Sequence, residues 1–175
     1  MTNGHSPLLD HCPPTLSAAA YYDADWFSRE QRLIWQREWV YAGRLNDLSK
    51  GVMRPLTVGG AGVILCRSPE GDVTAYHNTC RHRGSELCRA EQPLGKTIRC
   101  PYHAWSYAAA DGRLLSTAHA TPTDDFIKAE HGLFPVAVTI WNGFIFLNLA
   151  ESPAPFAPDL GLQAYDNWPM AHLVT

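Results

Sequence analysis

The spacing of apolar residues along this chain changes near residue 51. Before it, apolar side chains are interrupted by Glu30 and Arg37, and Asp23 or Asp25 precedes them as a candidate N-cap. After it, they fall in short β-prone runs separated by glycine and proline. The pattern therefore predicts one helix, from about Trp26 to about Trp39, followed by a mainly β chain. Because its apolar residues occupy more than one face, we expect this helix to dock against a larger body.

The expected strands are rich in β-branched and aromatic residues, and glycine or proline turns separate them. We expect turns at Gly59–Gly60, at Pro93–Gly95 and at Asn142–Gly143, where the last pair suits a tight hairpin. A helical turn is expected at Asp124–Lys128. The predicted strands are residues 52–58, 62–67, 73–77, 97–99, 105–107, 113–115, 133–141 and 143–149.

Composition and charge exclude several classes of function. The 175 residues carry a net charge of −3 and contain no basic run, which argues against a nucleic-acid partner. No apolar run reaches the ~18 residues of a membrane span, and the amino terminus lacks the features of a signal peptide. Five cysteines, an odd number, fit a reducing cytoplasm, which is the predicted location.

The strongest chemical signal is a repeated pairing of one cysteine with one histidine. Cys80-x-His82 is followed after seventeen residues by Cys100-x2-His103, which together offer two thiolates and two imidazoles. In an extended segment Cys80 and His82 would point to the same side, and Pro101 helps to fix the turn between the second pair. The spacing therefore predicts a metal site.

The mixed pairs distinguish between two kinds of metal site. Structural zinc usually takes two cysteines from one end of its motif and two histidines from the other. A two-iron cluster in which one iron takes both cysteines and the other both histidines needs one ligand of each type from each loop. With two thiolates instead of four, such a cluster is less negative and accepts an electron more readily. A zinc-stabilised interaction module is the alternative.

Around these ligands the sequence resembles the Rieske non-haem iron oxygenases, specifically the amino-terminal part of their large (α) subunit. The resemblance rests on residues 78–85, 99–107 and 111–115, with weaker likeness at 38–44 and 143–149. It implies a Rieske-type antiparallel β-sandwich with an inserted cluster-binding subdomain, at about residues 78–116, and an amino-terminal helix.

The resemblance also assigns residues. It implies that Cys80, His82, Cys100 and His103 bind one [2Fe-2S] cluster and that Trp105 covers the cluster loop. Family members usually have glycine where this chain has Ala104, so we expect one methyl group to crowd that loop. No catalytic residue is assigned to this chain.

We expect a division into a flexible lead-in with a docking helix (1–50), the Rieske domain (51–150) and a proline-rich exit segment (151–175). Among the remaining candidates, Cys66 is expected in the core, and His77, His119 and His131 are interpreted as structural or surface residues.

The function implied by the resemblance is electron transfer from a reductase or ferredoxin to a mononuclear Fe(II), held by a carboxyl-terminal catalytic domain or a separate subunit. The full protein would be a monooxygenase, dioxygenase or demethylase that assembles as a homo-oligomer, a trimer by family resemblance. The run Arg83–Cys88 favours the branch acting on quaternary amines such as glycine betaine or choline. The alternative is a free-standing Rieske-type ferredoxin.

Overall fold

The structure, a computed structural model, describes residues 14–157. The first part of the expected lead-in, with Cys12, and most of the expected exit segment, with His172, lie outside the described residues. The helical segments are η1 Ala18–Tyr21, α1 Ala24–Glu30, η2 Gln31–Trp35, η3 Leu45–Asp47 and η4 Lys128–His131. The strands are β1 Val40–Arg44, β2 Val52–Val58, β3 Ala61–Arg67, β4 Val73–His77, β5 Gln92–Pro93, β6 Thr97–Arg99, β7 Ser106–Ala108, β8 Leu114–Ser116, β9 Pro135–Trp141 and β10 Phe144–Asn148.

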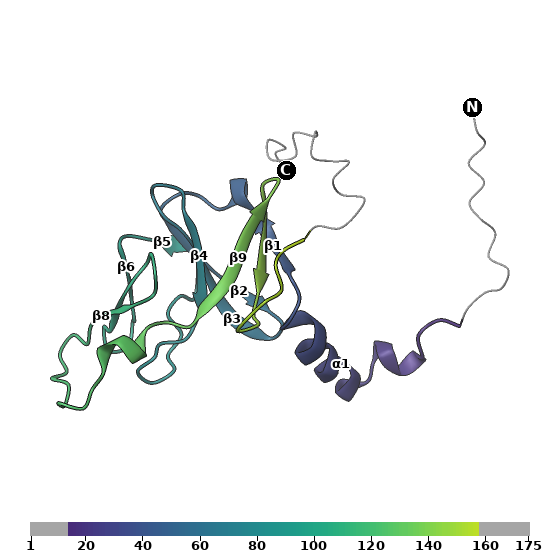
Figure 1. Cartoon of the computed structure of the whole chain (residues 1–175), viewed down its shortest axis with the longest axis horizontal. Coiled ribbons are helices and arrows are strands. Elements are labelled where there is room, and N and C mark those ends of the chain that lie inside the picture. Colours follow the sequence, from purple (N-terminus) through teal and green to yellow (C-terminus); the bar gives the residue numbers. More distant parts are fainter. Residues whose placement is uncertain (1–13, 158–175) are drawn as a thin grey trace.

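The strands form two antiparallel sheets (Figure 1). The larger sheet has the order β1-β10-β9-β4-β3-β2-β5, and the smaller, β6-β7-β8, projects beside it. The smaller sheet belongs to the segment between β4 and β9 along the chain. The expected mainly β architecture with an inserted subdomain and an amino-terminal helix is therefore confirmed.

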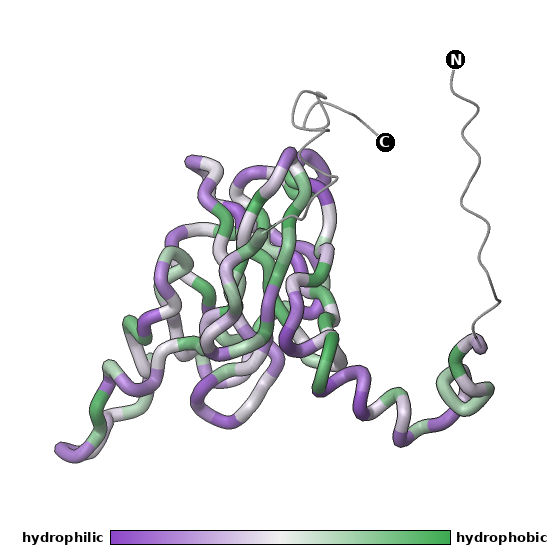
Figure 2. Tube along the Cα trace, turned by 45° about the vertical axis from the view of Figure 1, so that its right-hand side comes forward, coloured by the Kyte–Doolittle hydropathy of each residue, from purple (hydrophilic) through white to green (hydrophobic). Residues whose placement is uncertain are grey.

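Strand β3 separates two hydrophobic cores, which explains its unbroken apolar sequence. Val63 and Leu65 face the core shared with β9 and β10, whereas Ile64 and Cys66 face the core shared with the inserted subdomain. Successive residues of a strand point to opposite faces, so both faces of β3 must be apolar. Figure 2 shows the apolar residues concentrated along these strands. The inserted subdomain therefore packs on the face of the main sheet that carries Ile64 and Cys66.

The amino-terminal helix is shorter than the sequence predicts. Asp23 caps it, since its Oδ1 accepts from the amides of Asp25 at 2.8 Å and Trp26 at 2.9 Å. The prediction that it continues to Trp39 is wrong: α1 passes into the π-helical turn η2, and the chain then becomes β1, whose Val40 lies opposite Leu147 of β10. No residue of α1 or η2 is buried within the described chain.

Two short strands and two turns differ from expectation. Strands β1 and β5 were not predicted, and Pro93 pairs with Val52 instead of forming a turn. In place of the expected helical turn from Asp124 to Lys128, Asp124 and Asp125 form a single turn, in which the amide of Phe126 donates to the carbonyl of Thr123 at 3.0 Å, and the helical segment η4 begins only at Lys128. The Asn142–Gly143 hairpin is confirmed, with φ of 46° and 79° at the two residues, as a type I′ turn requires.

The division of the chain at residues 50 and 150 stays a prediction, although β1, which pairs within the main sheet, lies before the first of these boundaries. Among residues 14–157, none of the helices combines the length and the apolar character needed to span a bilayer.

Candidate metal centre

The two cysteine–histidine pairs lie on two turns of the same design. In the first, the amide of Gly84 donates to the carbonyl of Cys80 at 2.9 Å; in the second, the amide of Ala104 donates to the carbonyl of Cys100 at 3.1 Å. Each turn ends in the left-handed region, with φ of 70° at Gly84 and 58° at Ala104. The extended conformation expected for the first pair is therefore wrong, because Cys80 and His82 are brought together by a turn.

The turns bury the cysteines and leave the histidines nearer the surface. Cys80 and Cys100 are buried, whereas His82 and His103 are half-buried with ring centroids 4.8 Å apart. Burial raises the pKa of the Cys80 thiol. Burial acts in the same direction on Cys100, but hydrogen bonds from the backbone of Tyr102 and His103 outweigh it and lower that pKa. The second thiol is thus the more easily ionised.

The residues present fit a two-iron cluster. The Nδ1 atom of His103 is buried without a hydrogen-bond partner, a cost that a bound metal would remove. In the part of the chain that the structure describes, no three His, Cys, Asp or Glu side chains converge as they would around a single ion. The donors lie instead as a cysteine pair and a histidine pair. The assignment of all four as ligands stays a prediction.

Trp105 holds the histidine side of the centre in place. Its buried ring stacks on His82, with centroids 4.7 Å apart and planes 12° from parallel. Phe126 and His131 pack edge-on against the same indole at 5.9 and 6.0 Å. This aromatic group restricts the rotation of the His82 ring.

Tyr107 is a site residue to which the sequence reasoning gave no role. It is fully buried, and its hydroxyl lies 3.1 Å from the Cys80 sulfur. The amide of Arg81 donates to the same hydroxyl oxygen at 3.1 Å, so the hydroxyl hydrogen is free to point at sulfur. Burial, reinforced by Cys80, raises the pKa of Tyr107, which keeps the phenol protonated as a donor. The available signal for a role of Tyr107 was its position in the stretch 99–107 that carries the resemblance, two residues after Trp105.

Asn78 lies in the stretch 78–85 that carries the resemblance, but no role was predicted for it from the sequence. It is buried, and its Oδ1 accepts from the amides of Leu87 and Cys88 at 3.0 and 2.9 Å. Its Nδ2 donates to the carbonyl of Cys88 at 2.7 Å. These bonds join the two ends of the first loop and hold Cys80 between them.

Four other cysteines and histidines of the described residues have surroundings of their own. Cys66 is in the core, as expected, and burial raises the pKa of its thiol to about 12. His77 packs edge-on against Phe134, and burial lowers its pKa. His131 is half-buried, its Nδ1 2.9 Å from a backbone carbonyl. His119 is exposed and lines a hollow of about 380 Å³ together with the two candidate histidines.

Comparisons with known proteins agree with this arrangement. A family model described as the Rieske [2Fe-2S] domain matches residues 38–130. The glycine betaine monooxygenase oxygenase subunit of Chromohalobacter salexigens is 40% identical over 134 residues, which cover 76% of this chain and 30% of the relative. This chain therefore spans about a third of that relative's length.

Two solved structures share the fold. One is a quaternary ammonium Rieske monooxygenase described in connection with carnitine oxidation and inter-subunit electron transfer; it aligns with a TM-score of 0.71 and 26% identity over 78% of this chain and 37% of its own. The other is a naphthalene 1,2-dioxygenase variant, with a TM-score of 0.66 and 28% identity over 75% of this chain and 30% of its own.

Proposed function

This chain belongs to the Rieske [2Fe-2S] domain family, and on that premise we propose that it is the electron-transfer domain of a non-haem iron oxygenase large subunit. It receives electrons singly from a reductase or ferredoxin and supplies them to a mononuclear Fe(II) held by a carboxyl-terminal catalytic domain or a separate subunit. The observation that carries the proposal is the pair of similar turns, which bury two cysteines beside two adjacent histidines. The complete protein is an oxidoreductase whose catalytic residues lie outside this chain.

In this proposal Cys80 and Cys100 would hold one iron of the cluster, and His82 and His103 would hold the other. A cluster held there would supply one-electron transfer, at about −150 to +300 mV against roughly −400 mV for an all-thiolate ferredoxin of the plant type. The burial of the two cysteines places the sulfur side inside the protein. The half-buried imidazoles then form the side from which electrons leave.

The residues around the ligands position them and adjust their charge. Tyr107 donates a hydrogen bond to the Cys80 sulfur, which stabilises negative charge on that atom. Trp105 keeps the ring of His82 in one orientation. Asn78 closes the first loop around Cys80. Each of these contacts is made by a buried side chain, so water does not compete for it.

We propose a quaternary amine as the substrate class of the complete protein. The support is the 40% identity to a glycine betaine monooxygenase subunit and the structural likeness to a quaternary ammonium monooxygenase. The likeness to a naphthalene dioxygenase makes aromatic-ring hydroxylation the second candidate. Assembly as a trimer and a cytoplasmic location are further parts of this proposal and rest on the family resemblance and the cysteine content.

Metal analysis of anaerobically purified protein tests the cluster. We expect two irons and two acid-labile sulfides per chain, and after reduction with dithionite the anisotropic electron paramagnetic resonance signal of a mixed-valence diiron centre. One zinc per chain without sulfide would show that the site is a zinc module instead.

The free-standing ferredoxin is the less favoured alternative, because the relatives reported above are oxygenases. The reading frame beyond Thr175 and the proteins that copurify with this chain separate the two. For an oxygenase, two histidines and a carboxylate arranged as a facial triad for iron are expected in that frame or in a separate subunit; the absence of such a triad from both would contradict the proposal.

A further inference from the structure

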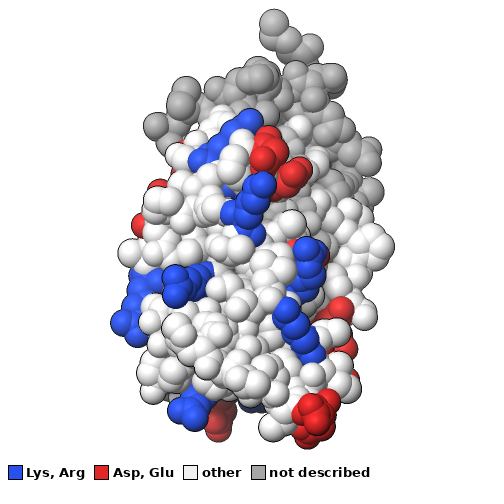
Figure 3. Space-filling view, turned by 90° about the vertical axis from the view of Figure 1, so that its left-hand side faces the viewer, with Lys and Arg blue, Asp and Glu red and all other residues white. Residues whose placement is uncertain are grey.

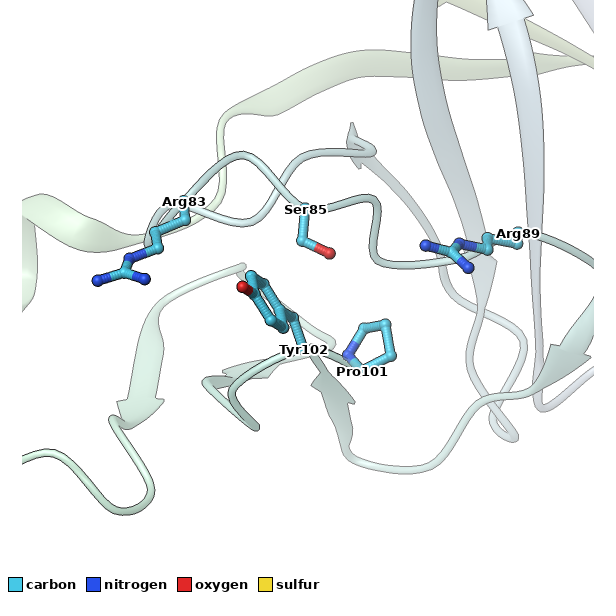
Figure 4. A pocket seen from close by; sticks show the side chains of 5 residues that line it. All are labelled: Arg83, Ser85, Arg89, Pro101 and Tyr102. Carbon is cyan, nitrogen blue, oxygen red and sulfur yellow. The ribbon is translucent and has the colours of Figure 1, made fainter.

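A basic groove lies beside the candidate metal centre. It has a volume of about 550 Å³ and is lined by Arg83, Ser85, Arg89, Pro101 and Tyr102. Figure 4 shows Ser85 and Tyr102 between the two arginines, with the Arg89 guanidinium directed toward the middle of the groove. Both ligand turns contribute to it, because Arg83 follows His82 directly and Tyr102 precedes His103.

Tyr102 connects the groove to the candidate ligands. The residue is 62% exposed, so a docked molecule can reach its ring. Its ring nevertheless packs on His103, with centroids 3.7 Å apart. Any molecule seated in the groove therefore contacts an aromatic ring that itself touches a candidate ligand.

The charge of the subdomain is opposite to that of the whole chain. Residues 78–116 contain six Lys and Arg against three Asp and Glu, a net charge of +3, whereas the whole chain carries −3. Figure 3, which faces the end of the molecule that carries this subdomain, shows basic side chains spread across it. A region of this sign attracts acidic surfaces and speeds their association.

The acidic side chains of the subdomain do not neutralise the two arginines of the groove. Glu91 pairs with Arg54 at 2.5 Å, and Asp111 pairs with Arg113. Glu86 lies 3.7 Å from Arg89, but both side chains are largely exposed, and such a pair is weak. Arg89 can therefore exchange this partner for a carboxylate of another protein at little cost.

We propose that the groove formed by Arg83, Ser85, Arg89, Pro101 and Tyr102 docks an acidic face of the electron-donating protein. This inference rests on the proposed function. A docked donor passes one electron through the contact and is itself oxidised by one electron, with no bond made or broken. The hollow lined by His82, His103 and His119 adjoins the groove, since Tyr102 lines both.

Charge reversal of the groove tests the proposal. The physiological donor is not identified, so the probe is a reduced plant-type [2Fe-2S] ferredoxin with an acidic surface, mixed with the cluster-loaded protein in a stopped-flow instrument. We expect R83E/R89E to slow reduction by about tenfold or more at low ionic strength. The difference should shrink at about 0.15 M salt, where screening weakens exposed charges.

Two controls separate docking from other effects. R29E/R32E, on α1 and η2, changes the net charge by the same amount away from the groove, and it should keep nearly the wild-type rate. Photoreduced 5-deazariboflavin, a small uncharged reductant that needs no docking site, should reduce wild type and R83E/R89E about equally. The electron paramagnetic resonance signal of the reduced protein should be the same in wild type and in R83E/R89E. An equal loss of rate in R29E/R32E, or none in R83E/R89E, would overturn the inference.

The outcome also distinguishes this inference from the proposed function. A protein that shows no diiron signal contradicts the function itself. A protein with the signal but with rates indifferent to charge in the groove contradicts only the docking surface.

Discussion

Removal of one hydroxyl group at Tyr107 should lower the reduction potential of the centre. The Tyr107→Phe change deletes the donor that lies 3.1 Å from the Cys80 sulfur and leaves the ring in its buried position. Reduction adds a negative charge that is shared by the sulfur ligands, so the hydrogen bond is stronger in the reduced state. Without it, the reduced state loses more stabilisation than the oxidised state, and the potential falls.

The size of the shift follows from the energy of the hydrogen bond. A bond to a charged acceptor contributes about 1.5 to 3 kcal/mol. If the added electron accounts for about half of that, the two states differ by about 0.8 to 1.5 kcal/mol. At about 59 mV for each tenfold change in a one-electron equilibrium, the expected shift is roughly 30 to 65 mV downward. The amide of Arg81 also loses its acceptor, which should cost about 1 to 3 kcal/mol of stability.

A second buried tyrosine provides the matched control. The hydroxyl of Tyr76 donates to the carbonyl of Ala109 at 3.0 Å in the same core, and this acceptor is not a candidate ligand. Tyr76→Phe should therefore lower stability while the potential stays within about 10 mV of wild type. Redox titrations followed by visible absorption measure both variants. An unchanged or raised potential in Tyr107→Phe, or an equal shift in Tyr76→Phe, would refute the reasoning.

Three further predictions concern conformation, proton binding and ligand charge. Because Ala104 has φ of 58°, Ala104→Gly should raise the free energy of unfolding in urea by up to about 1 kcal/mol. Gly84→Ala should lower that free energy by a similar amount through backbone strain, since its added Cβ would meet nothing within 4 Å. The reverse order of the two variants would contradict the strain argument. Burial raises the pKa of the Cys66 thiol from 9.0 to about 12, so the unfolded chain releases this proton first as pH rises. The free energy of unfolding should then fall above about pH 9, by up to about 1.4 kcal/mol per pH unit from this group. Thermal melts at a series of pH values should show a shallower fall for Cys66→Ala than for wild type, and an identical slope would exclude the effect. His103→Cys replaces a neutral ligand with an anion and should keep a cluster of lower potential; a titration without a downward shift would show that ligand charge does not set the potential.

Much of the fold could be predicted because it depends on local patterns. The strands at residues 52–58 and 73–77 and the Asn142–Gly143 hairpin needed only alternation, β-propensity and a dipeptide that accepts positive φ. The end of the helix could not be predicted, since helix-forming residues continue up to Trp39. Pairing of Val40 with Leu147, more than a hundred positions along the chain, decides that end.

The amino-acid order by itself determined the candidate ligand set, because the chemistry of a thiolate or an imidazole and its spacing within a short turn are local properties of the chain. The tertiary structure alone decided what surrounds those ligands. It places the Tyr107 hydroxyl at the Cys80 sulfur across twenty-seven positions, stacks Trp105 on His82, and joins Arg83 to Tyr102 in one groove. Such contacts depend on how two distant turns pack against one β-sheet, and no local pattern in the sequence specifies that packing.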